Sequence, residues 1–192
     1  MIDPYKITNF NQTDNQLQEF VLFCPAVAGK KAIIIAEKLD QFLSLDRNDI
    51  PPFDKIRNMI ASYSLTTNME HVKLGKYNLL SKCYRYLVES NINLKTCSIE
   101  ELEQIPGFNK KTSRFFILHS RLDQNNIACL DTWQLTYLKD QGYNVPKTLT
   151  SKSYDYWEKI YLDHAKNLGA ESIAEFDLEI WNRYTKKIVS KI

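Results

Sequence analysis

The sequence predicts an all-α protein of about eight to ten short helices. Apolar residues recur at helical spacing along most of the chain, and no segment alternates convincingly at the period of two that a half-buried strand shows. With only 5 glycines and 6 prolines in 192 residues, a β fold with many tight turns is disfavoured. Hydrophobic residues make up 44% of the chain, which is enough for one domain with a single core or two lobes.

Helical spacing, N-cap residues and helix breakers predict each helix in order. Pro25 is expected to interrupt the first helix, and Asp131 with Thr132 to begin a later one that ends at Gly142. On the helix 77–91, basic and aromatic side chains that include Tyr84 are expected on the solvated face. The expected helices are 17–23, 30–45, 53–64, 77–91, 98–104, 113–121, 133–141, 154–167 and 173–189.

Composition and spacing argue against a protein that is basic throughout, a zinc or iron–sulfur protein and a membrane-spanning protein. The formal net charge is +2, from 25 basic and 23 acidic residues, so any nucleic-acid partner has to meet a local basic patch. Cys24, Cys83, Cys97 and Cys129 lie too far apart for a zinc or iron–sulfur site, and we expect them as reduced core residues. The polar start of the chain and the lack of a long apolar run predict an intracellular protein without a membrane span.

Residues 105–112 form a tight turn between two expected helices. They read Ile-Pro-Gly-Phe-Asn-Lys-Lys-Thr, in which the Pro-Gly pair ends the preceding helix. Asn109, like Gly107, tolerates the left-handed backbone conformation. Such a turn points backbone N–H groups outward at the start of the next helix, where phosphate groups commonly bind. We therefore expect Gly107, Asn109, Lys110 and Thr112 to contact a phosphate backbone.

Lys111 and Asp131 are the candidate catalytic residues. Lys111 falls in the first turn of the second helix, where the positive end of the helix dipole disfavours a protonated amine, and a neutral amine is a nucleophile. That helix is about 15 Å long and the connector after it spans up to about 30 Å, so the chain can return Asp131 to the neighbourhood of Lys111. Taken singly, Lys111 fits a solvated lysine and Asp131 a simple helix cap.

Together these residues resemble the signature of a known family. Residues 105–112, followed by Leu-Asp-Thr at 130–132, are similar to the motif of the helix-hairpin-helix DNA glycosylases, with the hairpin at 98–121. The resemblance implies a two-lobed helical bundle with its active site in a cleft between the lobes. It implies that Lys111 attacks the sugar and forms a Schiff base, and that Asp131 stabilises the positive charge developing there. Such an enzyme removes a damaged base flipped out of the duplex and cleaves the strand as an AP lyase.

A second resemblance concerns base recognition. Asp177 and Trp181 lie four residues apart, on one face of the last expected helix. The compact archaeal-type 8-oxoguanine DNA glycosylases place a polar and an aromatic residue at this spacing late in the chain. The resemblance implies that Asp177 hydrogen-bonds the flipped base and Trp181 stacks on it, with Trp133 close by, although alone Trp181 fits a core aromatic. Ser64 and Leu65 align loosely with the residues that fill the vacated stack.

The sequence departs from the family pattern at three places near the expected site. Asn109 replaces the second hairpin glycine, Trp133 stands where a histidine usually follows the Asp-Thr pair, and residues 123–126 replace a loop rich in glycine and proline. The iron–sulfur cysteines of the endonuclease III branch are absent. We therefore expect no cofactor. A monovalent cation at the hairpin is the one ion that stays open.

The expected partner is double-stranded DNA that contains a damaged base, bound by a monomer with no role for a membrane. We treat residues 1–192 as a single glycosylase domain. Two alternatives stay open. One is a glycosylase for another oxidised or alkylated base, and the other is a non-catalytic helix-hairpin-helix DNA-binding protein. Trp133 favours the non-catalytic alternative, whereas the retained Lys111 and Asp131 oppose it.

Overall fold

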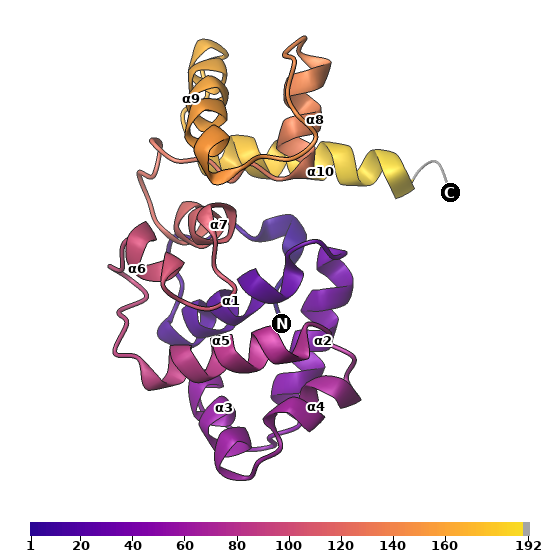
Figure 1. Ribbon diagram of the computed structural model, residues 1–192, viewed down its shortest axis with the longest axis vertical. Helices are drawn as coiled ribbons and strands as arrows, with labels where there is room; N and C mark the ends of the chain where they lie inside the picture. Colours follow the sequence, from indigo (N-terminus) through magenta and orange to yellow (C-terminus); the bar gives the residue numbers. More distant parts are fainter. Residues whose placement is uncertain (190–192) are drawn as a thin grey trace. The chain divides into compact units, whose positions relative to one another are not determined.

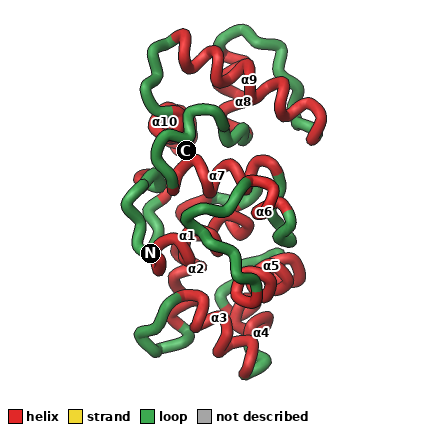
Figure 2. Tube along the Cα trace, turned by 90° about the vertical axis from the view of Figure 1, so that its left-hand side faces the viewer, coloured by secondary structure: helices red, strands yellow, loops and turns green. Residues whose placement is uncertain are grey.

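The computed structural model describes residues 1–189, and its regular structure in that range is entirely helical (Figures 1 and 2). The all-α prediction is therefore confirmed. A short 3-10 helix at Pro4–Lys6 precedes the α-helices. These are α1 (Asp14–Val27), α2 (Ala32–Ser44), α3 (Pro52–Ala61), α4 (Leu65–His71), α5 (Tyr77–Glu89), α6 (Ile99–Glu103), α7 (Lys110–Ser120), α8 (Thr132–Asp140), α9 (Ser151–Asn167) and α10 (Ile173–Val189).

The chain divides into two compact units. The first contains Met1–Pro4 and Asn11–Thr112, and the second contains Tyr5–Phe10 and the chain from Ser113 onward. The division falls within the first turn of α7, so the two catalytic candidates belong to different units, Lys111 to the first and Asp131 to the second. The assignment of residues 1–192 to one domain stays a prediction.

The first unit packs its helices around α1 and α5. Helix α5 contacts α1, α3 and α4, and α2 contacts α1 and α3, as the lower part of Figure 1 shows. Tyr84 of α5 lies in this core rather than on a solvated face, because its ring is fully buried and its hydroxyl donates to the Leu22 carbonyl at 2.9 Å. The largest fully buried side chains of the unit include Phe20, Phe23, Phe42, Ile56, Leu65, Met69 and Leu74.

The second unit is centred on α10, against which both α8 and α9 pack (Figure 1). Aromatic rings fill the space between these three helices, with the Tyr137 ring centroid 5.8 Å from that of Phe176 and 6.5 Å from that of Tyr184. The Tyr184 hydroxyl donates to Asp140 at 2.5 Å, which joins α10 to the end of α8. From α9, the Tyr161 ring lies 5.7 Å from that of Phe176, so side chains of both α8 and α9 hold the last helix.

Several helix boundaries differ from the sequence prediction for local reasons. Helix α1 contains Pro25 and ends at Val27, soon after it, and the helix starts early because the Thr13 side chain caps it. Helix α4 occupies a stretch expected to be a polar end of α3. Helix α9 starts at Ser151 because the Thr150 side chain accepts from the Ser153 amide in a capping box.

The four cysteines are buried thiols, as their spacing predicts. Burial raises the pKa of Cys83 to about 12, which keeps this thiol protonated in the core. Among residues 1–189, no group of three or more histidine, cysteine or acidic side chains is placed to hold a metal ion. None of the described helices is long and apolar enough to cross a membrane.

Candidate active site

The hairpin predicted at 98–121 is formed by α6 and α7. A capping box begins α6, in which the Ser98 hydroxyl accepts from the Glu101 amide at 3.1 Å and the Glu101 carboxylate accepts from the Ser98 amide at 2.7 Å. Ile105 and Phe108 are buried and anchor the turn in the first unit. Gly107 has a φ of 94°, and a Cβ atom there would lie 3.4 Å from the Leu79 Cγ. The turn therefore needs glycine at this position, as predicted.

Asn109 supports the hairpin differently from the sequence prediction. Its backbone does not take a positive φ, so it does not replace glycine as a left-handed residue. Its side-chain Oδ1 instead accepts hydrogen bonds from the Thr112 amide at 3.0 Å and from the Thr112 hydroxyl at 3.2 Å. Asn109 is thus the N-cap of α7. Thr112 is only 2% exposed and uses both groups inside the hairpin, while its contact with a phosphate backbone stays a prediction.

Lys111 lies in the first turn of α7 and belongs to a group of lysines in the first unit. The Lys76 ammonium donates to the carbonyl oxygens of Pro25 (3.1 Å) and Ala28 at the end of α1. Burial lowers the pKa of Lys76, and the positive charges of Lys30 and Lys111 lower it further. The positive charge gathered around Lys76, together with the N-terminal end of α7, makes this place favourable for an anion such as a phosphate group.

Asp131 is fixed at the start of α8 in the second unit. Its Oδ1 accepts from the Trp133 amide at 2.5 Å and from the Gln134 amide at 3.3 Å, so the predicted N-cap is present. Its own amide donates to the Cys129 carbonyl at 2.9 Å. Both the backbone and the carboxylate of Asp131 are therefore held in one orientation, as a group that stabilises developing charge requires.

Asp177 is a buried hydrogen-bond acceptor in the second unit. Its side chain lies 3.3 Å from His119 Nε2, and the other ring nitrogen, Nδ1, lies 2.8 Å from the Thr8 hydroxyl. Asp177 is 4% exposed and His119 is 1% exposed. The sequence reasoning missed His119, although a histidine in the middle of an apolar helix face is a signal for a buried polar contact. A role for Asp177 in base recognition stays a prediction.

The two tryptophans predicted near the base belong to α8 and α10, which pack together. The Trp133 ring centroid lies 6.4 Å from that of Tyr184, and Trp181 lies 5.6 Å from Tyr5. Both tryptophans are half-buried. The second unit therefore brings Trp133 and Trp181 onto neighbouring helices, while their contact with a base stays a prediction.

Gln134 joins the same two helices and was not predicted from the sequence. Its side-chain amide donates to the Asp177 carbonyl at 3.2 Å, and the residue is only 1% exposed. A polar residue at a core position of α8 indicates a buried hydrogen bond, and Gln134 is such a residue. This bond fixes the turn of α10 that carries Asp177 relative to the start of α8.

The two residues predicted to fill the vacated stack, Ser64 and Leu65, lie beside an exposed tyrosine, and their role in the stack stays a prediction. Leu65 is 1% exposed in the core of the first unit, and the Ser64 hydroxyl is paired with that of Ser62 at 2.9 Å. Tyr63, immediately before them, is 92% exposed and takes a left-handed φ of 56°. A bulky residue is costly in this conformation, and such strain is often found at functional sites. Tyr63 is therefore the side chain of this turn that can reach a partner.

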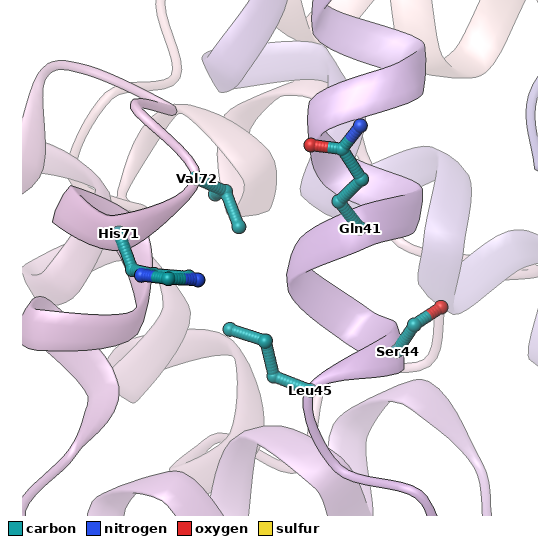
Figure 3. A pocket seen from close by; sticks show the side chains of 5 residues that line it. All are labelled: Gln41, Ser44, Leu45, His71 and Val72. Atoms are coloured by element: carbon teal, nitrogen blue, oxygen red, sulfur yellow. The ribbon is translucent and has the colours of Figure 1, made fainter.

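A separate surface pocket lies at the ends of α2 and α4 in the first unit (Figure 3). Its lining residues are Gln41, Ser44, Leu45, His71 and Val72. Figure 3 shows the His71 ring and the Leu45 side chain pointing toward each other across it. The Ser44 hydroxyl donates to the Asp40 carbonyl at 2.8 Å, so it is engaged in its own helix. The pocket contains none of the predicted site residues.

Comparisons with known proteins agree with the predicted resemblance. No protein-family model matches the chain. An 8-oxoguanine DNA glycosylase/AP lyase from Thermoplasma volcanium is 24% identical, in an alignment that covers 87% of this chain and 97% of the relative.

Two crystal structures of the 8-oxoguanine glycosylase from Methanocaldococcus jannaschii are similar to this chain. The structure in complex with a 15-mer DNA containing 8-oxoguanine has a TM-score of 0.64 and 22% identity, covering 95% of this chain and 87% of that chain. The other has a TM-score of 0.63 and 21% identity, covering 94% and 84%. The resemblance predicted from the hairpin is confirmed, and the chain has the helical fold of the archaeal 8-oxoguanine glycosylases.

Proposed function

We propose that the protein is a bifunctional DNA glycosylase/AP lyase that excises 8-oxoguanine from double-stranded DNA. The observation that carries the proposal is the helix-hairpin-helix itself, with Lys111 in the first turn of α7 and Asp131 capping α8. The relative from Thermoplasma volcanium and the solved structures from Methanocaldococcus jannaschii support the substrate, because all are described as 8-oxoguanine glycosylases.

In this proposal Lys111 is the nucleophile. Its neutral amine attacks C1′ of the damaged nucleotide, the bond from C1′ to the base breaks, and the base departs with the bonding electrons. Asp131 stabilises the positive charge that develops on the sugar, since an oriented carboxylate is most effective where charge appears in the transition state. The C1′–O4′ bond then breaks, and the proton lost from the lysine nitrogen is passed to O4′, which opens the sugar ring and gives a Schiff base between Lys111 and C1′. Loss of a proton from C2′ and departure of the 3′ phosphate then cleave the strand on the 3′ side by β-elimination.

The other predicted residues hold the DNA and the flipped base. The turn at Gly107 and Asn109, together with Lys110, contacts the phosphate backbone without reading sequence. Asp177, Trp181 and Trp133 form the base pocket of the second unit. Tyr63, rather than Ser64 or Leu65, stacks in the gap that the flipped base leaves, because its ring is exposed.

The protein acts as a monomer, inside the cell where its DNA substrate lies. The chemistry of the lysine and the aspartate needs no organic cofactor or iron–sulfur cluster. A monovalent cation at the hairpin carbonyl groups would help to hold the phosphate.

Borohydride trapping tests the proposed reaction. The wild-type protein is incubated with a duplex that contains one 8-oxoguanine, with borohydride present to reduce the Schiff base to a stable amine. We expect a covalent protein–DNA adduct with the wild type and none with Lys111→Gln or Lys111→Ala. Lys110→Gln is the matched control, because it removes one positive charge from the same turn and is expected to be trapped at saturating DNA.

The other outcomes separate the alternatives. Base release without trapping would indicate a monofunctional enzyme that uses water as its nucleophile. Trapping on a different lesion but not on 8-oxoguanine would indicate another oxidised or alkylated base. Duplex binding without activity on any lesion would favour the non-catalytic DNA-binding protein and overturn the proposal.

A further inference from the structure

A buried stretch without regular secondary structure leads into Asp131. Ile127, Ala128, Cys129 and Leu130 are all buried, and none of them belongs to a helix. Backbone N–H and C=O groups in such a stretch need partners, because an unpaired buried group is costly. Partners for Ala128 and Leu130 come from side chains of α9, within the second unit.

Tyr154 of α9 makes two hydrogen bonds to this stretch. Its hydroxyl donates to the Ala128 carbonyl and accepts from the Leu130 amide, each at 2.9 Å. Burial raises the pKa of Tyr154 well above its ordinary value, so the hydroxyl keeps its proton and can donate. One hydroxyl therefore bridges the two residues that precede and follow Cys129.

Glu158 lies one turn further along α9 and binds the amide of Ala128, whose carbonyl is bound by Tyr154. Its Oε1 accepts from the Ala128 amide at 2.8 Å and from the Arg114 Nε at 2.6 Å. The Arg114 guanidinium also lies 5.0 Å from the centre of the Tyr154 ring. Arg114 is 9% exposed, Glu158 is 7% and Tyr154 is 5%. These three side chains form a buried clamp on residues 128–130.

We infer that Tyr154 and Glu158 are positioning residues for Asp131, and that the clamp sets the place of its carboxylate against the sugar of a bound nucleotide. This inference rests on the proposed function. Residue 130 directly precedes Asp131, whose amide also bonds to Cys129, so a shift of the clamped backbone moves the carboxylate with it. An electrostatic stabiliser works only when it is oriented before the reaction, and a displacement of about 1 Å can cost about a hundredfold in rate.

Packing alone would explain a loss of stability but not a selective loss of one chemical step. Asp131 stabilises the charge that appears when the base leaves. An abasic site has already lost its base, so Schiff-base formation there depends on Lys111 and less on Asp131. Weakening the clamp is therefore expected to slow base excision while trapping at an abasic site continues.

The test compares Tyr154→Phe with Tyr84→Phe. Both variants remove a buried tyrosine hydroxyl that donates to a backbone carbonyl at 2.9 Å, but Tyr84 lies in the first unit and contacts Leu22. Single-turnover excision is measured on a saturating 8-oxoguanine duplex, and borohydride trapping on an abasic duplex. We expect Tyr154→Phe to excise about tenfold more slowly or worse, with abasic trapping retained, and Tyr84→Phe to match the wild type in both.

Glu158→Gln gives a second test, because it keeps the side-chain volume and an oxygen for the Ala128 amide while removing the charge opposite Arg114. Excision by this variant is expected to fall with abasic trapping retained. If both variants excise as fast as the wild type, or if excision and abasic trapping fall together, the inference is overturned.

Hydrogen exchange separates a failure of the inference from a failure of the proposed function. The Leu130 amide is expected to exchange faster in Tyr154→Phe than in the wild type and in Tyr84→Phe. An unchanged exchange rate would contradict the clamp whatever the activity. A wild type that neither excises 8-oxoguanine nor is trapped would contradict the proposed function, even where the exchange result supports the clamp.

Discussion

Asn109 can be tested by removing its side-chain amide while the rest of the hairpin stays intact. Its Oδ1 accepts from the Thr112 amide and hydroxyl, and Thr112 is 2% exposed, so water does not readily replace these bonds. An N-cap contributes about 1 kcal/mol and a buried hydroxyl bond about another 1 kcal/mol. We therefore expect Asn109→Ala to lower the free energy of unfolding by about 2 kcal/mol, which lowers Tm by about 4–8 °C.

Two variants sharpen this measurement. Asn109→Asp keeps an acceptor oxygen, and a carboxylate is favourable at a helix N-terminus, so its Tm is expected to stay near that of the wild type. The same negative charge repels phosphate, so its affinity for duplex DNA is expected to fall. Thr13→Ala removes an exposed N-cap bond to the Gln16 amide at 3.3 Å and is expected to cost less than Asn109→Ala.

Thermal and urea unfolding of these variants would decide the role of Asn109. A Tm for Asn109→Ala no lower than that of Thr13→Ala would refute the buried cap. A loss of stability in Asn109→Asp as large as in Asn109→Ala would refute it as well, because the carboxylate retains the acceptor.

Tyr63→Gly is expected to leave Tm unchanged or to raise it slightly, because Tyr63 is 92% exposed and glycine takes its left-handed φ without strain. Excision from a duplex is expected to slow by about tenfold or more, because aromatic stacking contributes about 1–3 kcal/mol per base; an unchanged rate would exclude Tyr63 from the stack. Leu65→Ala is expected to lower the free energy of unfolding by about 2–5 kcal/mol in urea titrations, because it opens a cavity in the core, with no change in excision per folded molecule. Burial lowers the pKa of His164 below its ordinary value of 6.5, so the unfolded chain binds this proton more readily than the folded one. The stability that the neutral ring contributes is therefore fully present above about pH 6.5 and is lost as the pH falls toward the folded pKa. As the pH is lowered through this range, Tm should fall less steeply for His164→Gln than for the wild type. An equal slope would contradict a lowered pKa for His164.

Helices could be predicted from the sequence where the apolar spacing and the capping or helix-breaking residues indicated the same ends. Helix α10 was expected at 173–189 and is found at Ile173–Val189, and buried residues recur along it at helical spacing, at Ile173, Asp177, Ile180 and Tyr184. Asp131 was expected as an N-cap and is one. Helix α4 was missed because Ser64 and the threonines after it have the composition of a turn, while burial of Leu65 and Met69 stabilises the helix.

The candidate site was harder to predict, because it depends on contacts between residues distant in sequence. The motif located Lys111 and Asp131 but left the clamp of Tyr154 and Glu158 unnoticed, although these two lie four residues apart on one face of α9. The role of Asn109 was also misjudged. Asparagine tolerates a left-handed backbone and also caps helices, and only the position of its side chain distinguishes the two.

The role of Lys111 is tested most directly by locating the covalent bond in the trapped adduct. The complex formed with an 8-oxoguanine duplex and borohydride is digested with nuclease and protease, and the nucleotide-bearing peptide is sequenced by mass spectrometry. We expect the sugar remnant on the Nζ atom of Lys111. A remnant on Lys76, on Lys110 or on any other residue would contradict the proposed nucleophile.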